Sequence, residues 1–178
     1  MRWRTGKLKR QIRRNVFETN SSSMHSLTVT SGNLNKGNLF IDFDNRVEVS
    51  FGEFGCEECD YSDQYSKLQY ILTMCVETEG CECVKPEEFY ETDGFKLISD
   101  AVAKHCNCDG IRVKDNELET DHWDYGDEDY LSHKGYIDHQ SSEDYSSVKD
   151  FLEQNSISSV AEFIFNDGVI VHTDNDNY

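Results

Sequence analysis

The sequence contains no long apolar segment. No stretch approaches the roughly 18 consecutive apolar residues that a membrane-spanning helix needs. The first residues are basic, as in a signal peptide, but polar Gln11, Asn15 and Glu18 stand where the apolar part of such a peptide would follow. We therefore expect a cytoplasmic protein that has no membrane partner.

Basic residues are scarce as well. The chain has 17 Lys and Arg against 35 Asp and Glu, and its formal net charge is −18. Residues 1–14 hold seven of the basic residues and no acid, so residues 15–178 are still more acidic. A surface of this charge repels nucleic-acid phosphates and attracts basic surfaces. The charge predicts a basic protein partner and no direct binding of DNA, although solubility alone is a competing explanation.

The sequence also lacks the short motifs of common catalytic sites. There is no G-x-S-x-G, no H-E-x-x-H and no glycine-rich loop that could hold a phosphate. A catalytic interpretation would use His25, Asp138 and His139, but a nucleophile, a base and an orienting group must meet in space, which adjacency in the chain does not ensure. The serine run at 21–23 is better explained as a turn whose hydroxyls satisfy backbone groups. We expect no enzymatic activity, with a phage-encoded hydrolase or nuclease as the alternative.

Length and composition predict one folded domain. The length of 178 residues fits a single domain. The apolar fraction of 37% is low, but 12% of the residues are aromatic and supply burial area. We predict a basic arm at residues 1–14 and a single acidic α+β domain at residues 15–178.

The hydrophobic periodicity predicts about four helices and a small mixed sheet. Helices are expected over residues 61–78 and 93–104, with two more near Val148 and Val160. Residues 38–51 should form a hairpin that turns at Asp44-Asn45. Further strands are expected at 27–29, 110–113, 136–139 and 169–172, and a long loop at 115–133. The helices do not alternate regularly with the strands, which favours an α+β fold over a doubly wound sheet.

Seven cysteines are present in a chain that we expect in a reducing compartment, where metal ligands and free thiols are commoner than disulfides. Two pairs flank the helix predicted at 61–78, and four thiolates around one ion would form a closed structural zinc site. The predicted ligands are Cys56, Cys59, Cys81 and Cys83, and the alternative ligands are His105, Cys106 and Cys108. The competing interpretation is that these cysteines are small buried hydrophobic residues.

Acidic and aromatic residues gather between positions 117 and 130. Carboxylates pair with Arg and Lys, and aromatic rings offer their faces to the same cations. The sequence therefore predicts a partner-binding site here, with a solvated loop as the alternative. The predicted contact residues are Glu119, Asp121, Trp123, Asp124, Tyr125, Asp127, Glu128 and Asp129.

One long string of residues resembles a known signature. Residues 13–26, which read RRNVFETNSSSMHS, are similar to the N-terminal signature of a family of small proteins encoded by phages and mobile elements of Gram-positive bacteria. Residues 135–141 (GYIDHQS) and 163–167 (FIFND) also resemble motifs of that family. The resemblance implies a phage- or prophage-encoded protein in a bacterial host, and the family has no assigned enzymatic activity that could be carried over to this chain.

In size, charge and cysteine content the chain is also similar to type II-A anti-CRISPR zinc metalloproteins. That resemblance implies an inhibitor that binds a type II CRISPR guide-RNA-directed nuclease and blocks the loading of target DNA. Such a nuclease holds its nucleic acids in positively charged channels, which would attract an acidic protein. The basic arm could contact guide RNA. A general host-takeover protein with another basic target is the alternative.

Overall fold

The computed structural model describes residues 10–12, 23–55, 57–122, 128–138 and 145–175. Within these residues it contains five α-helices, one short 3-10 helix and several small sheets, so the expected mixture of helices and strands is confirmed. The buried hydrophobic residues form one core cluster. No described helix combines the length and the apolar character needed to cross a membrane.

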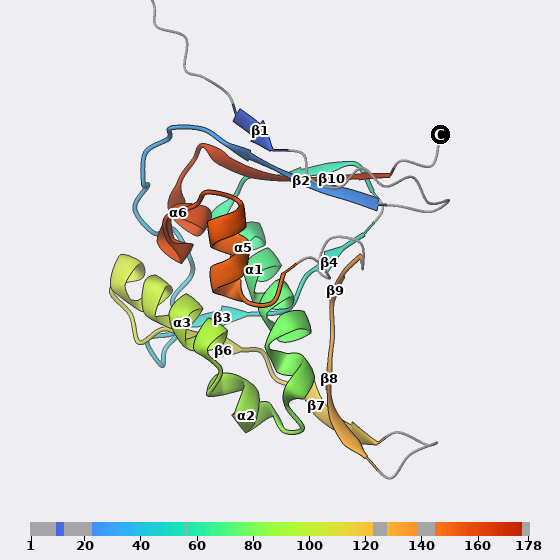
Figure 1. The fold of residues 1–178 in the computed structure, drawn as a ribbon. Helices are drawn as coiled ribbons and strands as arrows, with labels where there is room; N and C mark the ends of the chain where they lie inside the picture. The colour runs from blue at the N-terminus through green and yellow to red at the C-terminus, as the bar shows by residue number, and fades with distance from the viewer. Residues whose placement is uncertain (1–9, 13–22, 56, 123–127, 139–144, 176–178) are drawn as a thin grey trace, which may run out of the picture.

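The largest sheet is antiparallel and has four strands. They are β1 (Arg10–Ile12), β2 (Ser23–Val29), β10 (Val169–Asn175) and β5 (Cys59–Tyr61), in the order β1-β2-β10-β5. The strands predicted at 27–29 and 169–172 are confirmed within β2 and β10. Alternate residues such as Leu27 and Val171 are buried, so one face of the sheet covers the core (Figure 1). Part of the predicted basic arm, residues 10–12, forms β1.

Helix α1 (Gln64–Thr78) runs through the middle of the molecule (Figure 1). It begins at Asp63, whose side chain accepts a hydrogen bond from the backbone N–H of Ser66. Apolar residues occur on most of its sides, which is typical of a helix surrounded by protein. Its buried residues are Lys67, Leu68, Tyr70, Ile71, Leu72, Thr73, Met74, Cys75 and Val76. The helix predicted at 61–78 is therefore confirmed and forms the centre of the core.

The described residues contain four further α-helices, three of which pack against α1. Helix α2 (Pro86–Tyr90) and helix α3 (Asp93–Cys106) follow the 3-10 helix η1 (Gly80–Glu82), and α5 (Val148–Gln154) and α6 (Val160–Phe165) come later in the chain. Helix α3 begins at Thr92 and ends where Asn107 takes a left-handed conformation, with φ of 58°. The helices expected at 93–104 and near Val148 and Val160 are confirmed, and the short helix α2 was not predicted.

The remaining strands form three pairs. Strand β3 (Val47–Val49) runs parallel to β6 (Ile111–Val113), and β4 (Glu53–Phe54) runs parallel to β9 (Tyr136–Ile137). The expected hairpin at 38–51 is wrong beyond its turn, because only one bridge, between Ile41 and Val47, joins its two sides. Strand β3 instead pairs with β6, whose Ile111 and Val113 are buried with Val47 and Val49.

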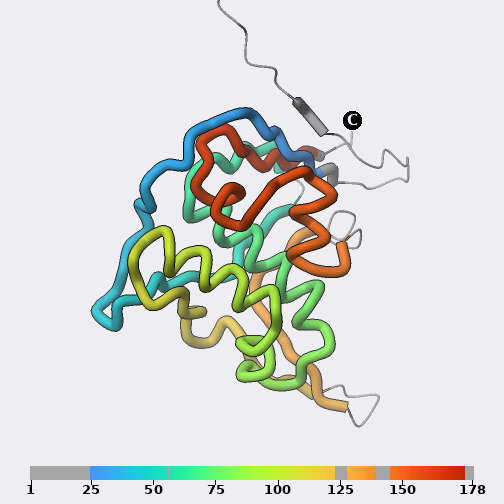
Figure 2. The backbone as a smooth tube through the Cα atoms, turned by 60° about the vertical axis from the view of Figure 1, so that its left-hand side comes forward, coloured from blue at the N-terminus to red at the C-terminus, as the bar shows by residue number. Residues whose placement is uncertain are grey.

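The long loop expected at 115–133 is also wrong. These residues form an antiparallel hairpin of β7 (Leu118–His122) and β8 (Asp129–His133). The hairpin extends from the body of the molecule at the end away from the four-stranded sheet (Figures 1 and 2). It is fixed to the body where the backbone N–H of Leu131 donates to the carbonyl of Cys83 and the hydroxyl of Thr120 donates to the carbonyl of Val84.

Candidate functional site

The β7–β8 hairpin carries the described part of the predicted partner-binding residues. Glu119, Asp121, Glu128 and Asp129 are all exposed. Trp123, Asp124, Tyr125 and Asp127 lie outside the described residues. The strand register opposes Asp121 to Tyr130, and the Tyr130 hydroxyl donates a hydrogen bond to Asp121 Oδ2 at 3.3 Å. Because side chains alternate between the two faces of a strand, Glu119 shares this solvent-facing side with Asp121 and Tyr130, while Leu131 faces the core.

A cleft lies beside the hairpin. It encloses about 650 Å³ between the end of α1, η1, strand β8 and strand β9. Glu77 and Asp138 contribute carboxylates to its wall, and Tyr130 and Tyr136 contribute aromatic rings. Glu77 also holds the cleft together, because its Oε1 accepts a hydrogen bond of 2.7 Å from the backbone N–H of Ile137. Tyr130 thus belongs both to the acidic hairpin face and to the cleft, so the two form one surface of carboxylates and tyrosines.

The structure describes two of the three residues of the catalytic interpretation, His25 and Asp138, and His139 lies outside the described residues. Burial lowers the pKa of His25 from 6.5 to about 4, although Asp138 and the Gly55 carbonyl favour the charged form. His25 Nδ1 is 3.4 Å from the hydroxyl of the buried Tyr70, whose own pKa burial raises. The imidazole is therefore neutral at physiological pH.

The described cysteines of the predicted zinc site do not come together. Cys59 lies in β5, before α1, while Cys81 and Cys83 lie in and after η1, beyond the other end of α1. A helix of 15 residues is about 22 Å long, which keeps Cys59 away from the other two. Cys56 lies outside the described residues. Among the residues that the structure describes, no group of three or more His, Cys, Asp or Glu side chains could hold a metal ion.

The Cys83 thiol favours the protonated form. Burial and the charge of Glu88 raise the pKa of Cys83, and Cys81 Sγ donates a hydrogen bond to the carbonyl of Thr78. A zinc ligand must be a thiolate. Cys59, Cys81 and Cys83 as placed here do not fit a single four-thiolate site, and zinc stays a prediction.

The alternative metal ligands have other contacts. The His105 ring stacks on Phe165 with centroids 4.0 Å apart, and its Nε2 is 2.6 Å from the carbonyl of Asn35. Burial raises the pKa of Cys106, and the thiol of Cys108 donates to the carbonyl of Gly110. The His105 ring thus connects the end of α3 to the β2–β3 connection through Asn35 and to α6 through Phe165.

Sequence reasoning missed one polar group on the outer face of the four-stranded sheet. His172 Nε2 is 2.8 Å from the hydroxyl of Thr28, and His172 Nδ1 contacts the carboxylate of Asp60. The register places His172 directly opposite Asp60 and diagonally across from Thr28. The order hydroxyl–imidazole–carboxylate is that of a nucleophilic triad, but a ladder of cross-strand side chains has the same order. No sequence pattern links these residues, because the strands that carry them are far apart in the chain.

Known proteins do not indicate what the candidate site binds. Comparison of the chain with protein-family models, with curated proteins and with solved structures found no match.

Proposed function

We propose that this protein acts by binding a basic protein partner through the β7–β8 hairpin and the adjacent cleft. The observation that carries the proposal is the continuous surface on which Glu119, Asp121 and Tyr130 lead into the cleft walls formed by Glu77 and Asp138. Carboxylates beside tyrosine rings suit the guanidinium and ammonium groups of Arg and Lys. The hairpin extends from the body, so a partner can reach it from outside (Figure 2).

The partner that we propose is a type II CRISPR effector nuclease. Such an enzyme reads its short DNA motif with arginines and holds nucleic acid in positively charged channels. A chain with net charge −18 would be drawn to these channels and would occlude them. Inhibition would be steric and electrostatic, would block the loading of target DNA and would involve no turnover. The resemblance of residues 13–26 to a phage-protein signature agrees with such a role and stays a prediction.

Neutralising the hairpin should weaken inhibition. In a one-to-one DNA cleavage assay, we expect the wild-type protein to block cleavage, and the double variant Glu119→Gln/Asp121→Asn to need about 10- to 100-fold more protein. The control is Asp100→Asn/Glu153→Gln, which makes the same change in net charge at exposed positions of α3 and α5 and should inhibit like the wild type. Inhibition should also weaken as salt is added. Equal loss in both double variants would show that only net charge matters, and would remove the hairpin from the proposal.

The same assay separates the alternatives. Inhibition at substoichiometric protein that grows with time would favour a hydrolase, and Thr28, His172 and Asp60 would then be the first residues to replace. Absence of inhibition, together with capture of a different basic protein from host lysate, would favour a general host-takeover protein.

Structural zinc is tested by elemental analysis of the purified protein. If the predicted cysteines hold zinc, Cys56→Ser and Cys81→Ser should each lower both the zinc content and the thermal stability, because binding energy at a structural site is folding energy. If both variants keep their zinc, His105, Cys106 and Cys108 become the candidate ligands. A wild-type protein without zinc would remove the prediction.

A further inference from the structure

Lys67 in α1 is the one charged side chain that is buried among the described residues, and it is 1% exposed. Its Nζ donates a hydrogen bond of 2.8 Å to the carbonyl of Asn166 and one of 3.2 Å to the carbonyl of Val169. Within the described part of the chain, no third acceptor lies within hydrogen-bond distance of Nζ. The remaining position on the nitrogen therefore holds either a third proton without a partner or the lone pair of a neutral amine.

The surroundings of Lys67 favour the neutral amine. Burial lowers the pKa of Lys67 from 10.5 to about 8, although the negative charges of Asp63 and Asp167 oppose this change. At neutral pH a measurable fraction of the molecules thus carries an uncharged amine, whereas an ordinary exposed lysine is almost entirely protonated. A desolvated lysine with this property is a nucleophile that attacks carbonyl carbons.

Lys67 also borders a cavity of about 460 Å³. The cavity lies between the β2–β3 connection, the start of α1 and the end of α6. Phe165 and Asp167 line it together with Lys67, and they are the two neighbours of Asn166, to whose carbonyl Nζ is bonded. The amine is therefore beside the wall of the cavity, where a small molecule can approach it.

The charges on the cavity wall disfavour anionic ligands. Asp63 and Asp167 line the cavity, and Lys67 is the one Lys or Arg among the described residues that line it. Two carboxylates outweigh one ammonium, so a negatively charged molecule is repelled. The same carboxylates stabilise a positive charge on the Lys67 nitrogen.

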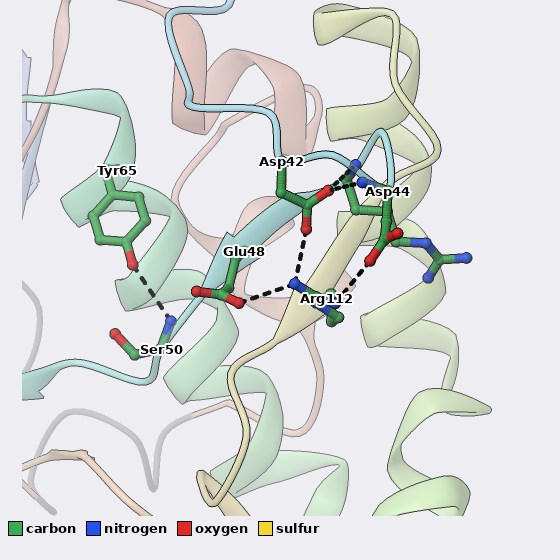
Figure 3. Close-up of polar contacts among 7 residues, drawn as sticks. Asp42, Asp44, Glu48, Ser50, Tyr65 and Arg112 are labelled. Carbon is green, nitrogen blue, oxygen red and sulfur yellow. Dashed lines mark hydrogen bonds and ion pairs between the residues drawn. The ribbon is translucent and has the colours of Figure 1, made fainter.

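Aromatic rings form another part of the wall. Phe40 and Tyr65 both line the cavity, and Phe40 is 80% exposed. The Tyr65 hydroxyl accepts a hydrogen bond of 3.4 Å from the backbone N–H of Ser50, which restrains the ring (Figure 3). Aromatic rings pack against other rings in stacked or edge-to-face arrangements. The wall therefore suits an uncharged molecule that contains an aromatic ring.

We propose that Lys67 forms an imine with an uncharged aromatic aldehyde or ketone that binds in this cavity. The proposal is independent of the proposed function, because it uses neither the hairpin nor the cleft.

The reaction needs no group beyond the amine, the carbonyl compound and water. The lone pair of Nζ forms the new C–N bond, and the carbonyl π electrons move to oxygen. One proton passes from nitrogen to that oxygen, a second proton is taken up from solvent, and the oxygen leaves as water. The product is a protonated imine, whose one remaining N–H can still donate to the Asn166 carbonyl. Its positive charge equals that of the ammonium, so Asp63 and Asp167 stabilise it as they stabilise the protonated lysine.

Reductive trapping of the imine tests the proposal on the wild-type protein. Benzaldehyde and cyanoborohydride are added near the pKa of Lys67, and mass mapping of peptides gives the fraction of each lysine that carries a benzyl group. We expect Lys67 to be labelled about 10- to 100-fold faster than the exposed Lys104 and Lys114, because a larger fraction of it is neutral. This preference should disappear when the chain is unfolded in denaturant. If Lys67 in the folded protein is labelled no faster than the exposed lysines, the proposal is overturned and Lys67 only caps the end of α6.

A matched pair of aldehydes tests the charge of the cavity. The para-carboxyl derivative of benzaldehyde has the same ring and one added negative charge. Compared with benzaldehyde, and relative to Lys104 in each reaction, we expect it to label Lys67 about 10-fold less. Equal relative labelling by the two aldehydes would overturn binding in the cavity.

Phe40→Ser and Phe43→Ser form a matched pair of variants. Both phenylalanines are exposed in the β2–β3 connection, so both variants should stay folded, which thermal unfolding will verify. Only Phe40 lines the cavity. We expect the labelling of Lys67 to fall by about 5- to 10-fold in Phe40→Ser and to stay at the wild-type rate in Phe43→Ser. Wild-type labelling of Lys67 in Phe40→Ser would overturn binding in the cavity.

Discussion

Replacing Glu79 with alanine should lower the free energy of unfolding by about 2–4 kcal/mol. Glu79 ends α1, and its carboxylate binds the beginnings of two other helices. Oε2 accepts a hydrogen bond of 2.6 Å from the backbone N–H of Gly94 in α3, and Oε1 accepts one of 3.0 Å from the N–H of Val148 in α5. The first N–H groups of a helix have no partner within the helix and carry a partial positive charge. Loss of one carboxylate therefore leaves two helix beginnings without an acceptor.

Chemical denaturation of the purified variants measures this effect. Glu79→Gln keeps one acceptor oxygen and should lose about half as much stability as Glu79→Ala. Glu82→Ala is the control, because Glu82 is an exposed residue of η1 and should change stability by less than about 0.5 kcal/mol. Gly94→Ala should also destabilise, because a Cβ at that position would collide with the Glu79 carboxylate. If Glu79→Ala unfolds like the control, the two hydrogen bonds contribute nothing to stability.

Acidification should destabilise the protein through His25. Its pKa falls from 6.5 to about 4 in the folded protein, first because of burial. Between these two pH values the unfolded chain binds a proton that the folded protein does not, so the free energy of unfolding falls as pH falls from 6.5 towards 4. The total loss is on the order of 3 kcal/mol, and it levels off below pH 4.

Denaturation curves recorded from pH 7 to about pH 4 will measure this fall in the free energy of unfolding. Carboxylates titrate in the same range, so the informative quantity is the difference between variants. His25→Gln should lack the part of the pH dependence that belongs to His25, whatever its absolute stability. Identical profiles for His25→Gln and the wild type would contradict the lowered pKa.

The elements that the sequence predicted correctly are those in which apolar spacing dominates. In α1, the spacing of Leu68, Ile71, Leu72 and Cys75 indicates a helix, and all four are buried. In the β7–β8 hairpin, charged residues occupy most of the exposed positions, and only Leu118 and Leu131 mark the inner face. With so few apolar residues, the sequence shows no recognisable period of two, and its acidic composition predicts a loop instead.

Pairing between distant strands was not predictable either. The apolar pattern of Val47 and Val49 predicts a strand but does not indicate which other strand pairs with it. The nearest candidate in the sequence is residues 38–43. In the structure β3 pairs with β6, which lies more than sixty residues later in the chain. On the outer face of β6, Arg112 donates a hydrogen bond to Asp42 in the turn before β3. On the inner face of β6, Ile111 and Val113 are buried in the core. No single-sequence pattern encodes that choice.

The candidate site was predictable in part. The acidic and aromatic composition of residues 117–130 indicates a binding surface, and the described carboxylates of that stretch other than Glu117 are exposed. The cleft was not predicted, because Glu77 reads as the last polar residue of an amphipathic helix and Asp138 lies sixty residues away. The predicted length of α1 was itself an argument against a site that joins the cysteines at its two ends, since a straight helix holds them apart.

The four-stranded sheet has a consequence for protein synthesis. Strand β10, one of its two inner strands, comes from residues 169–175 and separates β2 from β5, which the ribosome makes more than a hundred residues earlier. At typical translation speeds, β2 and β5 wait about 5–30 s for the strand that pairs with both. During that time their backbone groups are open to other chains and to chaperones. A nascent chain that stalls before Val169 therefore lacks one of the two inner strands of its largest sheet.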